Sequence, residues 1–469
     1  MAEFTFNEKN DQTYIDIAAN GNGSEKAAFL IEALRRTASQ HGSGESLHAI
    51  EIGPGGGSAL EALSDNLEHT DTLGGKVLHI SLLELDGIES QRLHEVRQDI
   101  EQFATTSFHK GNAEHTDELF PDGADVVSAS AVMHEIYSYG NGYHSIDNAL
   151  GSITNTLHPN GHFAYRDVFS VDRMSQHERV RHIYDHESWV QFSRMFLGHY
   201  LEKANHPYHR QDDRIIFSQD SKRIELEQID SSKMLSIDAP IGLLREVQRH
   251  YITMRDYLWR SGILGFTPDL EGESSNDWLD VKRGHKRVHY KVNGKNEALL
   301  EALSEHGPHG KRTIDGDIFD QATDSLIVDF LNRADKGDNE CSKIWNEWLT
   351  REGAETYTYM TLNKFLGSVA MQSFIASDSK KILLPVQRDD VLIAPRLYYD
   401  RFLSRNLSNP LMDAKQLVLF KAIDTTNKSA ANKKEALMAL DVLGEHCERD
   451  TLAEIYVPVR KLFSNSRSS

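Results

Sequence analysis

The stretch from Glu51 to Leu60, EIGPGGGSAL, has the residue types of a loop that holds a ligand through its backbone. Its four glycines follow an apolar run, and a strand that ends in glycines and continues as a helix binds nucleotide-like ligands in α/β folds. The spacing excludes two such loops. A dinucleotide loop needs glycine at the first, third and sixth positions, but the sixth is Ser58 counted from Gly53, or Leu60 counted from Gly55. A P-loop ends in GKS or GKT, and this stretch has no lysine.

The residues around this loop alternate between strand and helix patterns. Apolar spacing predicts helices over 24–37, 59–68, 89–103 and 145–157, and strands over 47–52, 76–86, 105–114, 124–133 and 161–169. Five strands separated by helices predict a parallel sheet covered on both faces. The segment 214–229 reads as two strands around a polar turn, so we expect a terminal antiparallel hairpin there and a domain boundary near Ser232.

The pattern E-x-G-x-G-x-G in this loop resembles motif I of the class I S-adenosylmethionine-dependent methyltransferases. Three later stretches resemble the same family in the right order: LLELD at the end of the second strand, GNAEHTDELFPDGADVV before the fourth, and LHPNGHFAYRD before the fifth. The resemblance covers about residues 14–167. It implies an α/β fold, a Rossmann-like methyltransferase sheet with a terminal antiparallel hairpin, and S-adenosylmethionine as the cofactor.

The resemblance also assigns cofactor-binding positions. The glycines let the backbone approach the methionine part of the cofactor, and an acid at the second strand tip accepts the ribose hydroxyls. That acid is Glu84, or Asp86 if the register differs by two residues. Asn112 stands where the family usually has an aspartate for the adenine amino group, and its carbonyl can still accept that bond. The expected cofactor-binding residues are Glu51, Gly53, Gly55, Gly57, Glu84, Asp86, Asn112, Ala113 and Ala131.

The chemistry of methyl transfer points to the end of the fourth strand. The enzyme must align the acceptor atom with the methyl–sulfur axis and, for a hydroxyl acceptor, remove its proton. Small-molecule O-methyltransferases resemble the stretch AVMHEIYSYGNGYH in having a histidine and an acid after this strand. His134 is therefore the candidate general base; the alternative is that it only packs or orients the substrate. Glu135 either orients His134 or acts as the base instead of it.

Tyrosines near this histidine are the candidate substrate contacts. They are Tyr137, Tyr139 and Tyr143. A fourth candidate, Tyr14, precedes the first helix; we expect it either to stack over the cofactor or to belong to an ordinary amphipathic segment. The pair His182 and His186, spaced by four, would share one helical face, but we interpret it as structural and predict no metal site.

The second half of the chain, 233–469, has a mostly helical pattern and no resemblance to the family. We expect two domains, 1–232 for cofactor binding and 233–469 for substrate access or homodimer formation. The basic stretch 281–295 fits a salt-bridged face or a phosphate or RNA contact.

Composition limits the partners. The net charge of -20 disfavours nucleic acid as a partner. The chain has two cysteines, Cys341 and Cys447, which fits a reducing cytoplasm. No apolar run is long enough to span a membrane. We therefore expect a cytoplasmic enzyme that methylates a small polar metabolite at oxygen or nitrogen. The alternatives are an RNA or protein methyltransferase that docks its substrate through the second half, and a non-catalytic cofactor-binding scaffold.

Overall fold

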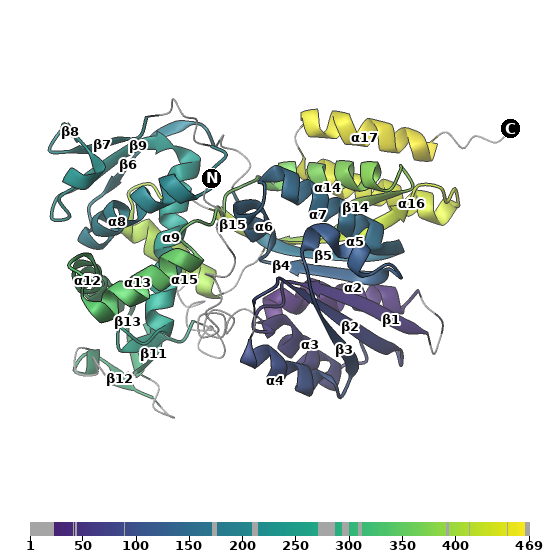
Figure 1. Ribbon diagram of the computed structural model, residues 1–469, viewed down its shortest axis with the longest axis horizontal. Helices are drawn as coiled ribbons and strands as arrows, with labels where there is room; N and C mark the ends of the chain where they lie inside the picture. The colour runs from purple at the N-terminus through teal and green to yellow at the C-terminus, as the bar shows by residue number, and fades with distance from the viewer. Residues whose placement is uncertain are drawn as a thin grey trace. The chain divides into compact units, whose positions relative to one another are not determined.

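The chain forms two compact units in the computed structural model (Figure 1). The model describes residues 23–40, 42, 45–88, 90–170, 176–208, 214–270, 287–292, 300–307, 312–390, 394–411, 413–447 and 449–464. The first unit, here called the sheet unit, comprises Met1–Asp172, Tyr359–Val391 and Ala414–Ser469. The second unit comprises Arg173–Thr358 and Leu392–Asp413.

The sheet unit contains a seven-stranded sheet in the order β14-β15-β5-β4-β1-β2-β3. The strands β1 to β5 are parallel to one another. Of these, β1, β2, β4 and β5 are mostly buried, as their apolar sequences predict, whereas the edge strand β3 is mostly accessible. The strands are β1 (Ser46–Ile52), β2 (Val77–Glu84), β3 (Ala104–Lys110), β4 (Ala124–Ser130), β5 (Leu157–Ser170), β14 (Lys381–Asp390) and β15 (Asp413–Asp424).

The last two strands, β14 and β15, pair antiparallel to each other, so one of them runs against the five parallel strands. This confirms the Rossmann-like class I methyltransferase sheet with a terminal antiparallel hairpin.

The origin of that hairpin differs from the prediction. Residues 214–229 do form two strands, β7 (Ile216–Gln219) and β8 (Lys222–Ile224), but these belong to a sheet of the second unit. The hairpin of the main sheet comes instead from 381–424. The expected boundary near Ser232 is therefore replaced by a crossing at 172/173, and the chain returns to the sheet unit at Tyr359.

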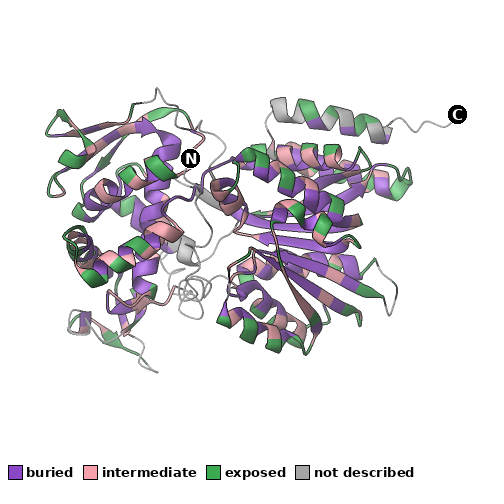
Figure 2. Cartoon of the chain, viewed as in Figure 1, coloured by how far each residue is buried: buried purple, intermediate pink, exposed green. Residues whose placement is uncertain are grey.

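Helices cover both faces of the main sheet (Figure 1). One layer contains α2 (Gly23–Ala38), α3 (Ser58–His69) and α4 (Gln91–Ile100). The other contains η2 (Ala113–His115), α5 (Thr116–Leu119), α6 (Met133–Tyr139), α7 (Tyr143–Thr156), α14 (Leu362–Ala376), α16 (Ala430–His446) and α17 (Arg449–Ser464). Figure 2 shows the strands buried between helices whose outer faces are exposed. One hydrophobic core joins residues of both halves of the sequence, such as Val127, Phe365 and Leu440.

The second unit combines helices with two four-stranded sheets, β6-β9-β7-β8 and β10-β11-β13-β12. Its helices are α8 (Glu187–Lys203), α9 (Ile241–Arg260), α12 (Gly316–Asp335), α13 (Asn339–Arg351) and α15 (Ala394–Asn406). Besides β7 and β8, its strands are β6 (Arg179–Tyr184), β9 (Leu235–Pro240), β10 (Phe266–Pro268), β11 (Arg287–Val292), β12 (Glu305–His306) and β13 (Arg312–Asp315), and η3 is Leu226–Gln228.

Two predictions for the second unit need correction. The segment 179–184, which contains His182, is a strand rather than part of the helix that the spacing of His182 and His186 would require, because it pairs with β9 along its whole length. His182 therefore lies on β6 and His186 precedes α8, so the pair shares no helical face. Of the basic stretch 281–295, the structure describes residues 287–292, which form β11 and include Arg287 and Lys291.

Across the described part of the chain, we find no helix that is both long and apolar enough to cross a bilayer.

Candidate cofactor and catalytic site

The candidate site lies at the carboxyl edge of the main sheet, where the parallel strands β1, β2, β4 and β5 end. Ligands of open α/β sheets bind at this edge, because the loops after the strands and the N-termini of the following helices meet there. The predicted cofactor residues lie at or just after the ends of β1, β2, β3 and β4, and the predicted base lies in the first turn of the helix after β4.

The glycine loop joins β1 to α3 and needs its glycines for two different reasons. Gly53 has φ 66°, and a Cβ on it would lie 2.8 Å from Cγ2 of Val132, so the position has neither the conformation nor the space for a side chain. Gly55 has φ 52°, but a Cβ on it would meet no atom of a described residue within 4 Å. The loop is therefore packed against the protein at Gly53, whereas the described residues leave the space at Gly55 open. Gly57, with φ 79°, caps α3.

Glu84 ends β2 and touches this open part of the loop. Its side chain is 8% exposed, and Oε2 accepts a hydrogen bond from the backbone N–H of Gly55 at 3.3 Å. Oε1 accepts from the N–H of Leu85 at 2.9 Å. These bonds aim a carboxylate at the glycine loop. Asp86, the alternative for the same role, is exposed in the turn after the strand.

Glu51 supplies a second buried carboxyl group beside the loop. It is 4% exposed, and its Oε2 has no hydrogen-bond partner within the described part of the chain. Burial raises its pKa to about 7; Lys26 acts in the opposite direction, and Glu84 adds a smaller increase. A buried acceptor without a partner is costly, so this atom fits a ligand that donates to it.

The other predicted cofactor residues lie at the ends of β3 and β4. Asn112 is exposed and caps η2, where its Oδ1 accepts from the N–H of Glu114 at 3.0 Å. Ala113 is buried in the core. Ala131 has φ 59°, rare for a residue other than glycine, and its N–H donates to the carbonyl of Arg166 at 2.8 Å. The left-handed turn at Ala131 directs the chain from β4 into α6.

His134 lies in the first turn of α6 and is fixed to β5 by one carboxylate. Its Nδ1 lies 2.8 Å from Oδ1 of Asp167, and its backbone N–H donates to Oδ2 at 3.1 Å. Asp167 is fully buried and also accepts from the N–H of Val168 at 2.8 Å. Because a carboxylate only accepts, it selects the tautomer of His134 that has its proton on Nδ1. The Nε2 atom of that tautomer carries the basic lone pair.

Three of the predicted tyrosines follow His134 on α6 and at the start of α7, and they differ in exposure. Tyr137 is 2% exposed and packs in the core, with its ring stacked on Tyr359 at 5.4 Å between centroids. Tyr143 donates its hydroxyl to the carbonyl of Tyr359 at 2.6 Å, and burial of that hydroxyl raises its pKa to about 12. Glu135 and Tyr139 are partly exposed on α6. Tyr14 lies outside the described residues.

Three residues of the site were not singled out from the sequence. Asp167 stands in the quoted stretch HFAYRD, and an acid inside an otherwise apolar strand was the available signal. Lys26 lies near Glu51 and donates to Oγ of Ser58 at 3.1 Å, which joins α2 to α3. Tyr359 gave no local signal, because the chain first leaves the sheet unit and reaches it only on its return.

Comparisons with known proteins give limited similarity. No model of a known protein family matches the chain, and no curated protein is similar to it in sequence. The carbon methyltransferase CurJ is 12% identical over 50% of this chain and 59% of that one, with a TM-score of 0.28. CalS10, an amino pentose methyltransferase from Micromonospora echinaspora, is 15% identical over 35% and 58%, with a TM-score of 0.24. The N-methyltransferase NodS from Bradyrhizobium japonicum is 12% identical over 51% and 94%, with a TM-score of 0.23.

This chain covers less than two thirds of the CurJ and CalS10 structures. The assignment of the sheet unit to the class I methyltransferase fold therefore depends on its strand order and on the residues at the sheet edge.

Proposed function

We propose that this protein transfers a methyl group from S-adenosylmethionine to an oxygen or nitrogen of a small polar metabolite. The observation that carries the proposal is the pair of buried carboxyl groups, Glu51 and Glu84, beside a glycine loop at which the described residues leave open space at Gly55. Glu84 adds to the cost of charging the buried Glu51, and a ligand that donates to the unpartnered Oε2 of Glu51 would reduce that cost.

The residues present fit this cofactor. Glu84 would accept the ribose hydroxyls, and the backbone of the glycine loop would approach the methionine part. The orphaned Oε2 of Glu51 would accept from the ammonium group of that part, which would also favour the ionised form of Glu51. Asn112 and Ala113 would lie on the adenine side. When bound, S-adenosylmethionine supplies an electrophilic methyl group on a sulfonium sulfur.

The chain's own part in the reaction is to hold and move a proton. A hydroxyl acceptor must lose its proton as its oxygen takes the methyl group, and Nε2 of His134 is the base that receives it. Asp167 is a positioning residue: its carboxylate keeps the proton of His134 on Nδ1 and stabilises the imidazolium after proton transfer. The net charge of -20 supports a neutral or cationic acceptor rather than nucleic acid.

Thermal unfolding with and without ligand tests the cofactor assignment. We expect S-adenosylmethionine and S-adenosylhomocysteine to raise the Tm of the wild type and to leave that of Gly55→Asp unchanged, because the new carboxylate would fill the open space next to Glu84. Gly75→Asp is the matched control, since Gly75 also has positive φ and open space around its Cβ position but lies before β2, at the other edge of the sheet. If neither ligand stabilises the wild type, the proposal fails.

Turnover of His134→Gln tests the proposed base. With labelled S-adenosylmethionine and a panel of small hydroxyl and amine acceptors, we expect this variant to lose about a hundredfold or more in kcat on a hydroxyl acceptor while it still binds the cofactor. Full turnover of the variant at neutral pH would rule out the base role without affecting the cofactor assignment.

A further inference from the structure

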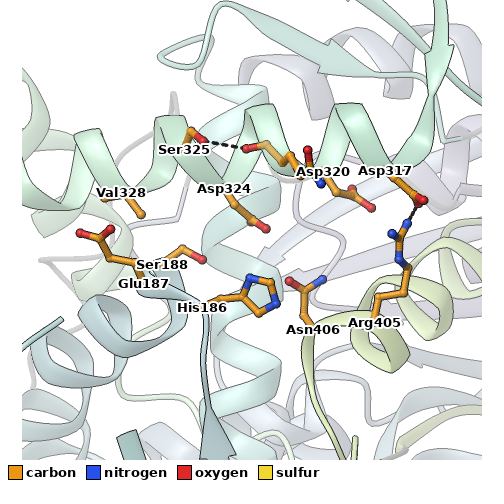
Figure 3. Close-up of a pocket in the computed structure, with 11 residues that line it drawn as sticks. His186, Glu187, Ser188, Asp317, Asp320, Asp324, Ser325, Val328, Arg405 and Asn406 are labelled. Atoms are coloured by element: carbon orange, nitrogen blue, oxygen red, sulfur yellow. Dashed lines mark hydrogen bonds and ion pairs between the residues drawn. The ribbon is translucent and has the colours of Figure 1, made fainter. Parts of the chain in front are cut away.

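A second polar site lies wholly within the second unit, between α8, α12 and α15. It is a cavity of about 590 Å³, a volume within the range of small-molecule sites. Figure 3 shows side chains from the start of α8, one face of α12 and the end of α15 converging on it. The lining residues are His186, Glu187, Ser188, Asp317, Asp320, Gln321, Asp324, Ser325, Val328, Arg405 and Asn406.

The charges that line the cavity are mainly negative. Four lining residues are acids, one is an arginine, and none is a phenylalanine, tyrosine or tryptophan. Two more guanidinium groups lie against these acids without lining the cavity. Arg255 is fully buried and pairs with Asp320 and Asp324, while Arg401 pairs with Asp317 and Asp320. With His186 neutral, the four acids exceed the three arginines by one charge.

One oxygen of the Asp324 carboxylate is held by two hydrogen bonds, and the other is not. Its Oδ1 accepts from Nη1 of Arg255 at 2.6 Å and from the hydroxyl of Tyr251 at 3.1 Å. Its Oδ2 has no hydrogen bond to a described residue. Burial raises the pKa of Asp324, and Arg255 acts against this. A cation with N–H groups in the cavity would stabilise the charged form of Asp324 and donate a hydrogen bond to its Oδ2.

Asn406 adds a neutral acceptor to the wall of the cavity. Its side chain is 7% exposed, and Nδ2 donates to the carbonyl of Phe402 at 2.8 Å. Its Oδ1 finds no partner in the parts of the chain that the structure describes. In Figure 3 the carboxamide points into the same space as Asp324 and the imidazole of His186. An amide oxygen on the wall of a cavity can accept a hydrogen bond from a ligand, and neither an anion without N–H or O–H groups nor an apolar ligand supplies that donor.

We infer that this cavity binds a small organic cation with N–H donors, a primary ammonium compound. The ammonium group donates to Oδ2 of Asp324 and Oδ1 of Asn406, and Glu187 at the rim adds attraction. A quaternary ammonium ion is excluded by the same geometry, because it has no N–H to donate and the lining residues offer no aromatic ring for a cation–π contact. The site does not depend on the proposed methyl transfer.

Calorimetric titration with putrescine tests the site in the full chain, and 1,4-butanediol and choline separate the contributions. Butanediol has the same length and terminal donors but no charge, and choline has the charge without N–H donors. We expect putrescine to bind with one site per chain, and both comparison compounds to bind at least about tenfold more weakly. Equal binding of butanediol, or absence of putrescine binding, would overturn the inference.

Variants locate the binding. Asp324→Asn should weaken putrescine binding by about tenfold or more, because it removes the charge that the ammonium faces. That change also removes a partner of Arg255, so Glu187→Gln, an exposed position on the rim, provides a second test with an expected loss of about threefold. Glu202→Gln is the control on the same helix, outside the cavity and expected to be neutral. If Glu202→Gln weakens binding as much as Glu187→Gln, the amine binds the general acidic surface and not this cavity.

Discussion

The burial of the Glu51 carboxyl group predicts how the free energy of unfolding changes with pH, and the test needs no substrate. In the folded protein burial raises its pKa from 4.5 to about 7. The folded state therefore binds the proton more tightly than the unfolded state does. The resulting stabilisation is fully present below pH 4.5 and is lost as the pH rises through 7.

The size of the effect follows from the shift in pKa. One unit corresponds to about 1.4 kcal/mol, so the free energy of unfolding should fall by about 3 kcal/mol between pH 4.5 and pH 8 because of this group alone. Glu51→Gln replaces the acid by a neutral group of similar shape that does not titrate. Between the same two pH values, the free energy of unfolding of this variant should therefore rise by about 3 kcal/mol relative to that of the wild type.

Urea unfolding of both proteins without cofactor, from pH 5 to pH 8.5, measures this difference. Glu68→Gln, an exposed position on α3, serves as the control and should give a difference that does not change with pH. If the difference for Glu51→Gln is also constant over this range, the carboxyl group is not a buried acid with a raised pKa, and the argument that it needs a ligand donor is refuted.

Three further predictions concern the proton balance and the packing of the sheet unit. Cofactor binding at pH 6 should release up to about 0.9 proton per chain, because the free protein has Glu51 mostly protonated and the bound cofactor favours its ion. Calorimetric titration in buffers of different ionisation enthalpy measures this release, which should vanish in Glu51→Gln. Asp167→Asn should move the ring proton of His134 from Nδ1 to Nε2 and lower kcat about tenfold or more. The tautomer is seen by ¹⁵N NMR, with His134→Gln to assign the signals, and an unchanged tautomer would contradict the positioning role. Tyr359→Ala should cost the sheet unit about 3 kcal/mol or more in urea unfolding, since it removes the ring stacked on Tyr137 and the hydroxyl 2.8 Å from that of Tyr165, and a loss below about 1 kcal/mol would show that the returning chain is not part of this core.

The sequence predicted the local features of the sheet unit well, because each depends on neighbouring residues. Buried parallel strands are continuous apolar runs, and the glycine loop is marked by its own composition, as at Gly53. The ends of the strands then brought Glu84 near Gly55, because parallel strands end at one edge of the sheet.

The predictions that failed depend on contacts distant in sequence. The segment 214–229 reads as two strands, whereas β14 and β15 lie in the half of the chain predicted to be mostly helical, and nothing local tells that the later pair completes the main sheet. The excursion of the chain through the second unit between 173 and 358 has no signature in apolar spacing. For the same reason the partner of His134 was missed, since Asp167 is 33 residues away and the two meet only when β5 pairs with β4.

The central claim is that the carboxyl edge of the sheet binds S-adenosylmethionine through Glu84. Calorimetric titration with S-adenosylhomocysteine tests it most directly, in the wild type, in Glu84→Ala and in Asp86→Ala, which removes an exposed acid two residues further along the chain. We predict one ligand per chain in the wild type, the same affinity in Asp86→Ala, and a loss of about tenfold or more in Glu84→Ala, because bonds from hydroxyls to a carboxylate are lost. No binding to the wild type, or a loss in Asp86→Ala with none in Glu84→Ala, would contradict the claim.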